Sequence, residues 1–255
     1  MKEKPSRLRL WAVVFWLLVW QCGSMALAAA YPHGQLLLAS PVDALMRLLT
    51  LAGTAPFWKA VGWSSARILG GFAIACAAAV VLAAVAARRA ALRALLYPPV
   101  AAVKAVPVAS FIILALVWLD ADSLSLFISA LMVFPPVYLN VLAGIDAADR
   151  ELLEMARVFR VPFRRQLWGI YLPQVLPYFR SAVSLGLGLC WKAGIAAEVI
   201  GLPGGSVGER LYTAKVYFQT PDLFAWTAVI VAVSIAFERL VLWGLDRLAG
   251  KAVRG

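Results

Sequence analysis

The sequence predicts an all-α membrane protein with six transmembrane helices, and two observations lead to this fold class. The mean hydropathy is +0.85 and only 15% of the 255 residues are charged, whereas about a quarter are charged in soluble globular proteins. Six apolar segments are also each about 20 residues long, the length that a helix needs to cross a bilayer. These segments are residues 11–29, 64–87, 99–119, 123–145, 178–200 and 223–243.

The first apolar segment has two interpretations. Ala26-Leu27-Ala28 follows a start rich in Lys and Arg, as at a signal-peptide cleavage site. The apolar run is longer than the hydrophobic region of a signal peptide, so we expect a retained helix. The chain then divides into a tail at 1–10, a transmembrane domain at 11–248 and a second tail at 249–255.

The positions of Lys and Arg predict the orientation of the chain, because cytoplasmic loops are enriched in both residues. With the N-terminus inside, the inner segments carry 16 of the 24 basic residues and the outer segments carry 4. Both termini and the loop at 146–177 are therefore expected in the cytoplasm. This placement accounts for the net charge of +11 without a nucleic-acid partner.

The first outer loop predicts a short helix. Ser40 is suited to cap its N-terminus, Pro41 to occupy the first position and Asp43 the third. Leu45 and Leu48-Leu49 then fall on one side, so we expect an amphipathic helix on the outer membrane surface.

The loop between the fourth and fifth spans, residues 146–177, predicts two short cytoplasmic helices. An apolar face with spacing i, i+3, i+4, i+7 forms the first helix: Leu152, Met155, Ala156, Phe159. After Pro162, a second apolar face follows: Phe163, Leu167, Ile170. Pro173 and Pro177 are expected to break the chain before it re-enters the membrane.

Two explanations fit this helix-turn-helix. Its arginines could be held by anionic headgroups while its apolar face rests on lipid. Alternatively, it protrudes and docks into a groove on a cytoplasmic partner. A sharp turn between two helices favours the docked elbow, because a loop resting on lipid needs no such turn.

The loop also resembles the cytoplasmic signature of bacterial ABC-importer permeases: Glu-Ala-Ala, three residues, Gly, nine residues, Ile, one residue, Leu-Pro. The chain has this spacing, with Arg160 where Gly stands in the motif: Glu154-Met155-Ala156, Arg160, Ile170, Leu172-Pro173. Similarity extends over roughly 60–245 to three further features: Pro107, Leu142-Ala143-Gly144 and Ala197-Glu198-Val199-Ile200-Gly201. Together these features resemble the branch associated with nitrate, sulfonate, taurine and thiamine-precursor uptake.

The resemblance implies a role for the loop and for its residues. The elbow would be a coupling helix seated in a cleft of a separate ATP-hydrolysing subunit, where ATP and Mg²⁺ bind, with no cofactor on this chain. The residues carried over from the motif are Glu154, Met155, Ala156, Ile170, Leu172 and Pro173, with Arg157 and Arg160 at the rim. Arg160 departs from the motif, whose glycine is expected to end the first helix in a left-handed conformation. A residue other than glycine adopts that conformation at a cost of about 1 kcal/mol, so either the turn is built differently here or the strain is tolerated.

The resemblance also implies partners and a location. The chain would lie in the bacterial plasma membrane as a multi-pass protein and work as a dimer, expected to be a homodimer. It would receive a small anionic or heteroaromatic solute from an extracytoplasmic binding protein and would contact membrane lipids.

Four charged residues fall within or beside the spans: Arg67, Lys104, Lys192 and Glu198. A charge in the middle of the membrane costs about 2.5–3.5 kcal/mol or more, so each is expected to have a partner or to reach water. Lys192 and Glu198 are six residues apart and point to different faces, so we expect Glu198 to pair with Arg67. Lys104 and Lys192 could snorkel, or Lys192 could line a path for an anionic solute.

Two other functional classes remain alternatives. The chain has no G-x-x-x-x-G-K-[ST] motif, so it is not itself an ATPase. A membrane enzyme is disfavoured by the single histidine, His33, and by three cysteines that lie within apolar runs without metal-ligand spacing. A gradient-driven carrier would favour an internal repeat, which the sequence does not show.

Overall fold

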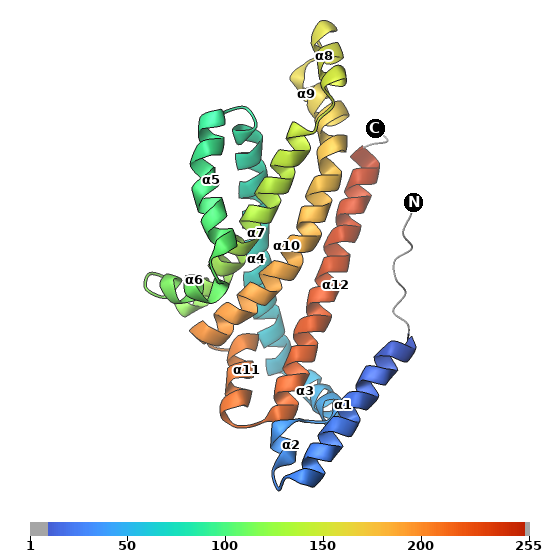
Figure 1. The fold of residues 1–255 in the computed structure, drawn as a ribbon, viewed down its shortest axis with the longest axis vertical. Helices are drawn as coiled ribbons and strands as arrows, with labels where there is room; N and C mark the ends of the chain where they lie inside the picture. Colours follow the sequence, from blue (N-terminus) through green and yellow to red (C-terminus); the bar gives the residue numbers. More distant parts are fainter. Residues whose placement is uncertain (1–9, 253–255) are drawn as a thin grey trace.

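The protein is a bundle of long helices (Figure 1). The computed structural model describes residues 10–252, and these contain helices but no strands. The elements are α1 (Leu10–Ala30), α2 (Gly34–Leu37), α3 (Pro41–Ala52), α4 (Ala55–Ala86), α5 (Ala90–Ala105), α6 (Val108–Ala115), α7 (Ala121–Asp146), α8 (Arg150–Val158), α9 (Phe163–Gln166), the π-helix η1 (Leu167–Tyr171), α10 (Leu172–Gly201), α11 (Val207–Val216) and α12 (Thr220–Ala252). Residues 1–9 of the predicted N-terminal tail lie outside the described residues, whereas Leu10 begins α1, and α12 continues into the predicted C-terminal tail.

The predicted fold class is confirmed. Five helices within residues 10–252 are long and apolar enough to cross a membrane, and the count becomes six if the bent pair α5 and α6 forms one span. The helix over Phe163–Gly201 is 39 residues long. Since about 20 residues cross the hydrocarbon core, this helix is long enough to project roughly 28 Å beyond it at 1.5 Å per residue.

The third predicted span, 99–119, is wrong in its boundaries and in its straightness. α5 begins at Ala90 and runs through Pro98 and Pro99, and the axes of α5 and α6 are bent by 107°. The break lies at Val106, which is extended at φ −87° and ψ 135°. Pro107 causes the break, because its ring excludes the preceding residue from the helical region.

The core of the bundle lies where α7 packs between α4 and α10. Buried aliphatic side chains line α7: Leu124, Ile128, Val133, Val137 and Val141. α4 approaches α7 closely at Gly71, where an added Cβ would stand 2.2 Å from the carbonyl oxygen of Leu126. By contrast, few of the side chains of α1 and α12 are buried in the single chain.

The two ends of the bundle carry different structures. α8 and α9 extend beyond the bundle at the end where α12 finishes, whereas α2, α3 and the turn after α11 lie at the opposite end (Figure 1). The predicted cap of α3 is confirmed, because the Ser40 hydroxyl accepts a 3.1 Å hydrogen bond from the Asp43 backbone N–H. One end therefore presents the loop at 146–177, and the other presents α3 and α11.

Candidate functional site

The projecting end is formed by residues 147–166, which we call the elbow: α8, the turn after it and α9. Asp149 caps α8, and its carboxylate accepts hydrogen bonds from the backbone N–H groups of Glu151 and Leu152 at 2.9 and 3.3 Å. The backbone N–H of Asp149 donates to Oε1 of Gln174 at 2.8 Å. The start of α8 is thus stabilised by its own N-terminal cap and by a hydrogen bond to α10.

Arg160 adopts the left-handed conformation in the turn of the elbow, with φ of 50°. The backbone N–H of Val161 donates to the Ala156 carbonyl at 2.8 Å, and that of Arg160 donates to the Arg157 carbonyl at 3.1 Å. These two bonds form a Schellman motif, in which glycine is the usual left-handed residue. The elbow therefore keeps a glycine-type turn at a cost of about 1 kcal/mol to Arg160.

The tip of the elbow is apolar and basic. Val158 and Phe159 are 78% and 75% exposed, and Met155 is also exposed. Glu154, Arg157 and Arg160 are exposed around them, as are Arg164 and Arg165 of α9. Exposed apolar side chains surrounded by charges on a rigid turn are typical of a protein-docking surface.

The remaining residues of the motif lie away from this tip. Ala156 is only 4% exposed, so it packs inside the elbow and does not reach its surface. Ile170, Leu172 and Pro173 are half-buried at η1 and the start of α10. The structure therefore places Glu154, Met155, Arg157 and Arg160 together and separates them from the second half of the motif.

The prediction that Pro173 and Pro177 break the chain is wrong, because the helix is continuous from α9 through η1 into α10. The backbone N–H of Leu172 donates to the Leu167 carbonyl, one residue further back than in an α-helix. A π-turn of this kind accommodates the missing N–H of Pro173 without a break. α9 of the elbow consequently continues into α10 as one helix over Phe163–Gly201.

A second contact fastens the elbow to the turn between α4 and α5. The Arg88 guanidinium lies 4.4 Å from the centre of the Phe163 ring, a cation–π arrangement. Nearby, Arg93 of α5 forms an ion pair with Asp146 at the end of α7. Sequence reasoning missed both contacts, because residues in different helices give no signal of their proximity in a single sequence.

The charged residues of the spans are arranged differently from the prediction. Arg67 pairs with Asp122 of α7 rather than with Glu198, and it lies 4.8 Å from the Trp63 ring. Lys104 and Lys192 are exposed on α5 and α10. Lys192 and Glu198 do point to different faces, because Glu198 is fully buried.

Glu198 has neutral partners. Its Oε2 accepts a 2.7 Å hydrogen bond from the Ser64 hydroxyl and a 3.2 Å bond from the backbone N–H of Gly208. Ser64 also accepts a 3.0 Å bond from the backbone N–H of Val207, so the start of α11 is held against α4 and α10. A Cβ added to Gly208 would stand 2.3 Å from Cβ of Glu198, so this close approach requires glycine.

Comparison with known proteins agrees with this architecture. Residues 77–254 match the family described as "Binding-protein-dependent transport system inner membrane component". The chain is 32% identical over 148 residues to an aliphatic sulfonates transport permease of Bacillus subtilis strain 168, which covers 56% of this chain and about half (53%) of that relative.

Two further relatives are matched over longer stretches. A taurine transport system permease of Escherichia coli K12 is 26% identical over 209 residues, 80% of this chain and 76% of the relative. A bicarbonate transport system permease of Synechococcus elongatus is 26% identical over 190 residues, 73% of this chain and 67% of the relative. The resemblance carried by the residues of the loop is thereby confirmed. The chain belongs to the family of binding-protein-dependent transport system inner membrane components and is a permease of the ABC-importer type.

Proposed function

We propose that the chain forms the translocation path of an importer driven by a separate ATP-binding subunit, which docks on the elbow. The observation that carries the proposal is a rigid, exposed elbow that continues directly into a membrane-spanning helix. Closure of two ATP-binding subunits would displace the elbows of two permease copies, a homodimer. The rod over Phe163–Gly201 would carry this displacement across the membrane. ATP and Mg²⁺ would bind to the partner subunit.

The elbow is the cytoplasmic end of the chain in this proposal. The inner segments carry 16 of the 24 basic residues, in keeping with a cytoplasmic location. The elbow and the end of α12 lie together at one end of the bundle, while α3 and α11 lie at the other (Figure 1). This arrangement supports an importer in the bacterial plasma membrane that receives solute from a binding protein at the α3 and α11 end.

The solute is proposed to be small and to be anionic or heteroaromatic. The names of relatives specify aliphatic sulfonates, taurine and bicarbonate, all of which carry an oxyanion group. Lys192 is exposed on α10, so its ammonium group could attract an anion at the interface between two copies. Arg67 is less suited to this role, because Asp122 already neutralises its charge.

The docking of the ATP-binding subunit can be tested with a charge reversal at the tip of the elbow. Glu154→Arg should preserve membrane insertion and abolish co-purification of the co-expressed ATP-binding subunit, because it places another positive charge among the arginines of the elbow. Deletion of residues 151–166 should have the same effect.

Asp120→Arg is the matched control, because Asp120 is an exposed acid in the turn before α7 and its side chain caps no backbone group. Unchanged co-purification of the Glu154→Arg variant would contradict the proposal. A gradient-driven carrier would instead transport solute as the purified chain in vesicles without nucleotide.

A further inference from the structure

We propose that the corner between α11 and α12 is the surface on which the extracytoplasmic binding protein docks. We call it the outer corner, and it comprises Arg210, Lys215, Tyr217, Phe218 and Gln219. The inference rests on the proposed function, which places this end of the bundle outside the cytoplasm. The family is dependent on a binding protein, so some surface at this end must receive one.

The outer corner exposes two adjacent aromatic rings. Tyr217 and Phe218 are each 69% exposed, and the residues before them in α11 include Glu209, Arg210 and Lys215. Three charges in a helix of ten residues exclude this helix from the hydrocarbon core. Large apolar side chains that project beside charged ones mark an interaction surface.

Phe218 is also held in a conformation that favours glycine. Its φ is 54°, and the turn is closed by hydrogen bonds from the backbone N–H of Gln219 to the Ala214 carbonyl at 2.8 Å and from that of Phe218 to the Lys215 carbonyl at 3.2 Å. A left-handed conformation at a bulky residue persists only where the surroundings impose it, and such strain concentrates at functional positions. The backbone that carries the ring of Phe218 is therefore held in a closed turn at the end of α11.

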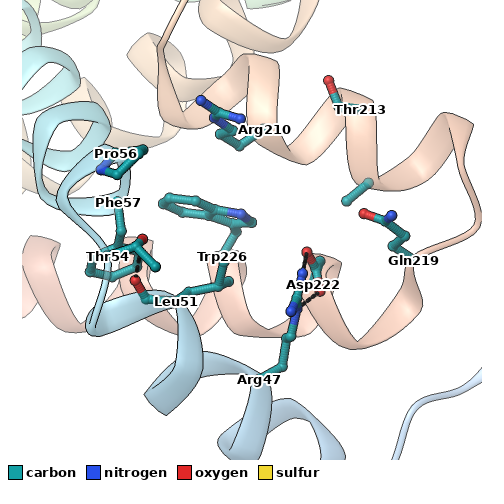
Figure 2. A pocket seen from close by; sticks show the side chains of 11 residues that line it. Arg47, Leu51, Thr54, Pro56, Phe57, Arg210, Thr213, Gln219, Asp222 and Trp226 are labelled. Carbon is teal, nitrogen blue, oxygen red and sulfur yellow. Dashed lines mark hydrogen bonds and ion pairs between the residues drawn. The ribbon is translucent and has the colours of Figure 1, made fainter.

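Contacts on both sides make the outer corner rigid. Ser64 and Glu198 hold the start of α11, as described above. Beyond the corner, the Thr220 hydroxyl donates to the Leu36 carbonyl, and Arg47 of α3 forms a bidentate ion pair with Asp222, with Nη2 and Oδ2 3.0 Å apart (Figure 2). The hydrogen bond to Asp222 raises the pKa of Arg47. A surface ordered before binding loses little entropy on docking.

The charge of the corner specifies the chemistry of the partner. Arg210 and Lys215 are exposed, and within residues 10–252 they form no ion pair. The carboxylate of Glu209 is engaged by the backbone N–H of Gly205 at 2.6 Å. The corner is therefore net positive around two aromatic rings, which suits a binding protein that offers an apolar recess with an acidic rim.

The inner elbow offers a matched control, because Phe159 is a similarly exposed ring beside a left-handed turn at the opposite end. The experiment uses the complete complex in nanodiscs and the purified binding protein of the same system. Phe218→Ala should weaken docking of the binding protein at least ten-fold and leave co-purification of the ATP-binding subunit unchanged. Phe159→Ala should weaken co-purification of the ATP-binding subunit and leave docking of the binding protein unchanged.

Phe218→Gly separates the ring from the turn, because glycine relieves the strain and removes the aromatic contact. Docking should be as weak as in Phe218→Ala. Docking at the wild-type level in either variant would overturn the inference. That result would be expected if the two rings contacted lipid headgroups instead of the binding protein. If instead Phe159→Ala and Glu154→Arg both leave the ATP-binding subunit attached, the proposed function fails, whatever the outer corner does.

Discussion

Single residues in the elbow and at the two ends of α11 show how local exceptions support the architecture. Phe218 and Arg160 each occupy a left-handed position that glycine would occupy without strain. Gly208 represents the opposite case, because only the absence of a side chain lets α11 meet Glu198. Arg160 could be recognised from the sequence, since it replaces a motif glycine, whereas nothing in the sequence around Phe218 indicates its conformation.

At this scale we predict that Gly208→Ala disrupts the outer end of the bundle. The added Cβ would overlap Cβ of Glu198 and the backbone nitrogen of Val199, at 2.3 and 2.6 Å. Displacing α11 would also remove the backbone hydrogen bonds of Ser64 and Glu198, and leaving a buried polar group without its partner costs about 1–3 kcal/mol. We expect a lower melting temperature and less monodisperse protein in detergent.

Gly204→Ala provides the control for this prediction. Gly204 lies four residues earlier, and a Cβ added there would meet no atom within 4 Å. The two variants make the same chemical change, one in the loop before α11 and the other in its first turn. Equal melting temperatures for them would show that the close packing of α11 on Glu198 contributes little to stability.

Among the elements, the elbow and α10 matter most for the proposed function, in which they form the route from the docked ATP-binding subunit into the membrane. The π-turn at Leu167–Tyr171 keeps them continuous despite Pro173. The Asp149–Gln174 hydrogen bond and the Arg88–Phe163 contact then tie the elbow to neighbouring helices. The apolar periodicity of the sequence matches the short helix α8, but the predicted second short helix is the start of the 39-residue helix over Phe163–Gly201. The sequence could not show that a π-turn would accommodate Pro173.

We predict that Arg88→Ala uncouples ATP hydrolysis from transport. Without the cation–π contact, the elbow would move without displacing the turn between α4 and α5. The ATP-binding subunit should still co-purify, because the exposed tip is unchanged, while the solute transported per ATP hydrolysed in proteoliposomes should fall several-fold. Arg88→Lys should retain most of the coupling, since an ammonium group can also lie over the ring.

The adjacent Arg89 supplies the control, because it is an exposed arginine in the same turn and, within residues 10–252, its side chain forms no ion pair. Arg89→Ala should therefore transport normally. A double-mutant cycle with Phe163→Leu tests the contact itself, since the two changes should be non-additive if the residues act together. Additive losses would show that Arg88 does not act through Phe163.

Over the whole molecule, the two projecting surfaces lie at opposite ends of the bundle: the elbow at one, and α3 with the outer corner at the other (Figure 1). Within residues 10–252, five or six helices are long and apolar enough to connect them as spans, depending on whether α5 and α6 count as one. In the proposed function, this separation would allow one chain to meet a cytoplasmic partner and an extracytoplasmic partner at the same time. The distribution of Lys and Arg predicts that the elbow lies in the cytoplasm.

Labelling of single cysteines should reveal this orientation. In a background without Cys22, Cys76 and Cys190, a membrane-impermeant maleimide should label Tyr217→Cys in intact spheroplasts and Val158→Cys only after lysis. Both positions are exposed in the single chain, so accessibility depends on the side of the membrane. Labelling of Val158→Cys in intact spheroplasts would reverse the orientation and invalidate the proposed docking of both partners.

The amino-acid sequence alone determined the fold class, the approximate spans, the cap of α3 and the position of the elbow, because hydropathy, periodicity and capping are local properties of the chain. The tertiary structure alone decided the partners of the buried charges. Arg67 meets Asp122 and Glu198 meets Ser64 because α4, α7 and α10 come together in the folded bundle. It also decided that Pro107 bends a span whereas Pro173 leaves its helix continuous. The effect of each proline depends on whether the surrounding backbone can form an alternative hydrogen bond, and that choice is made by packing over the whole chain.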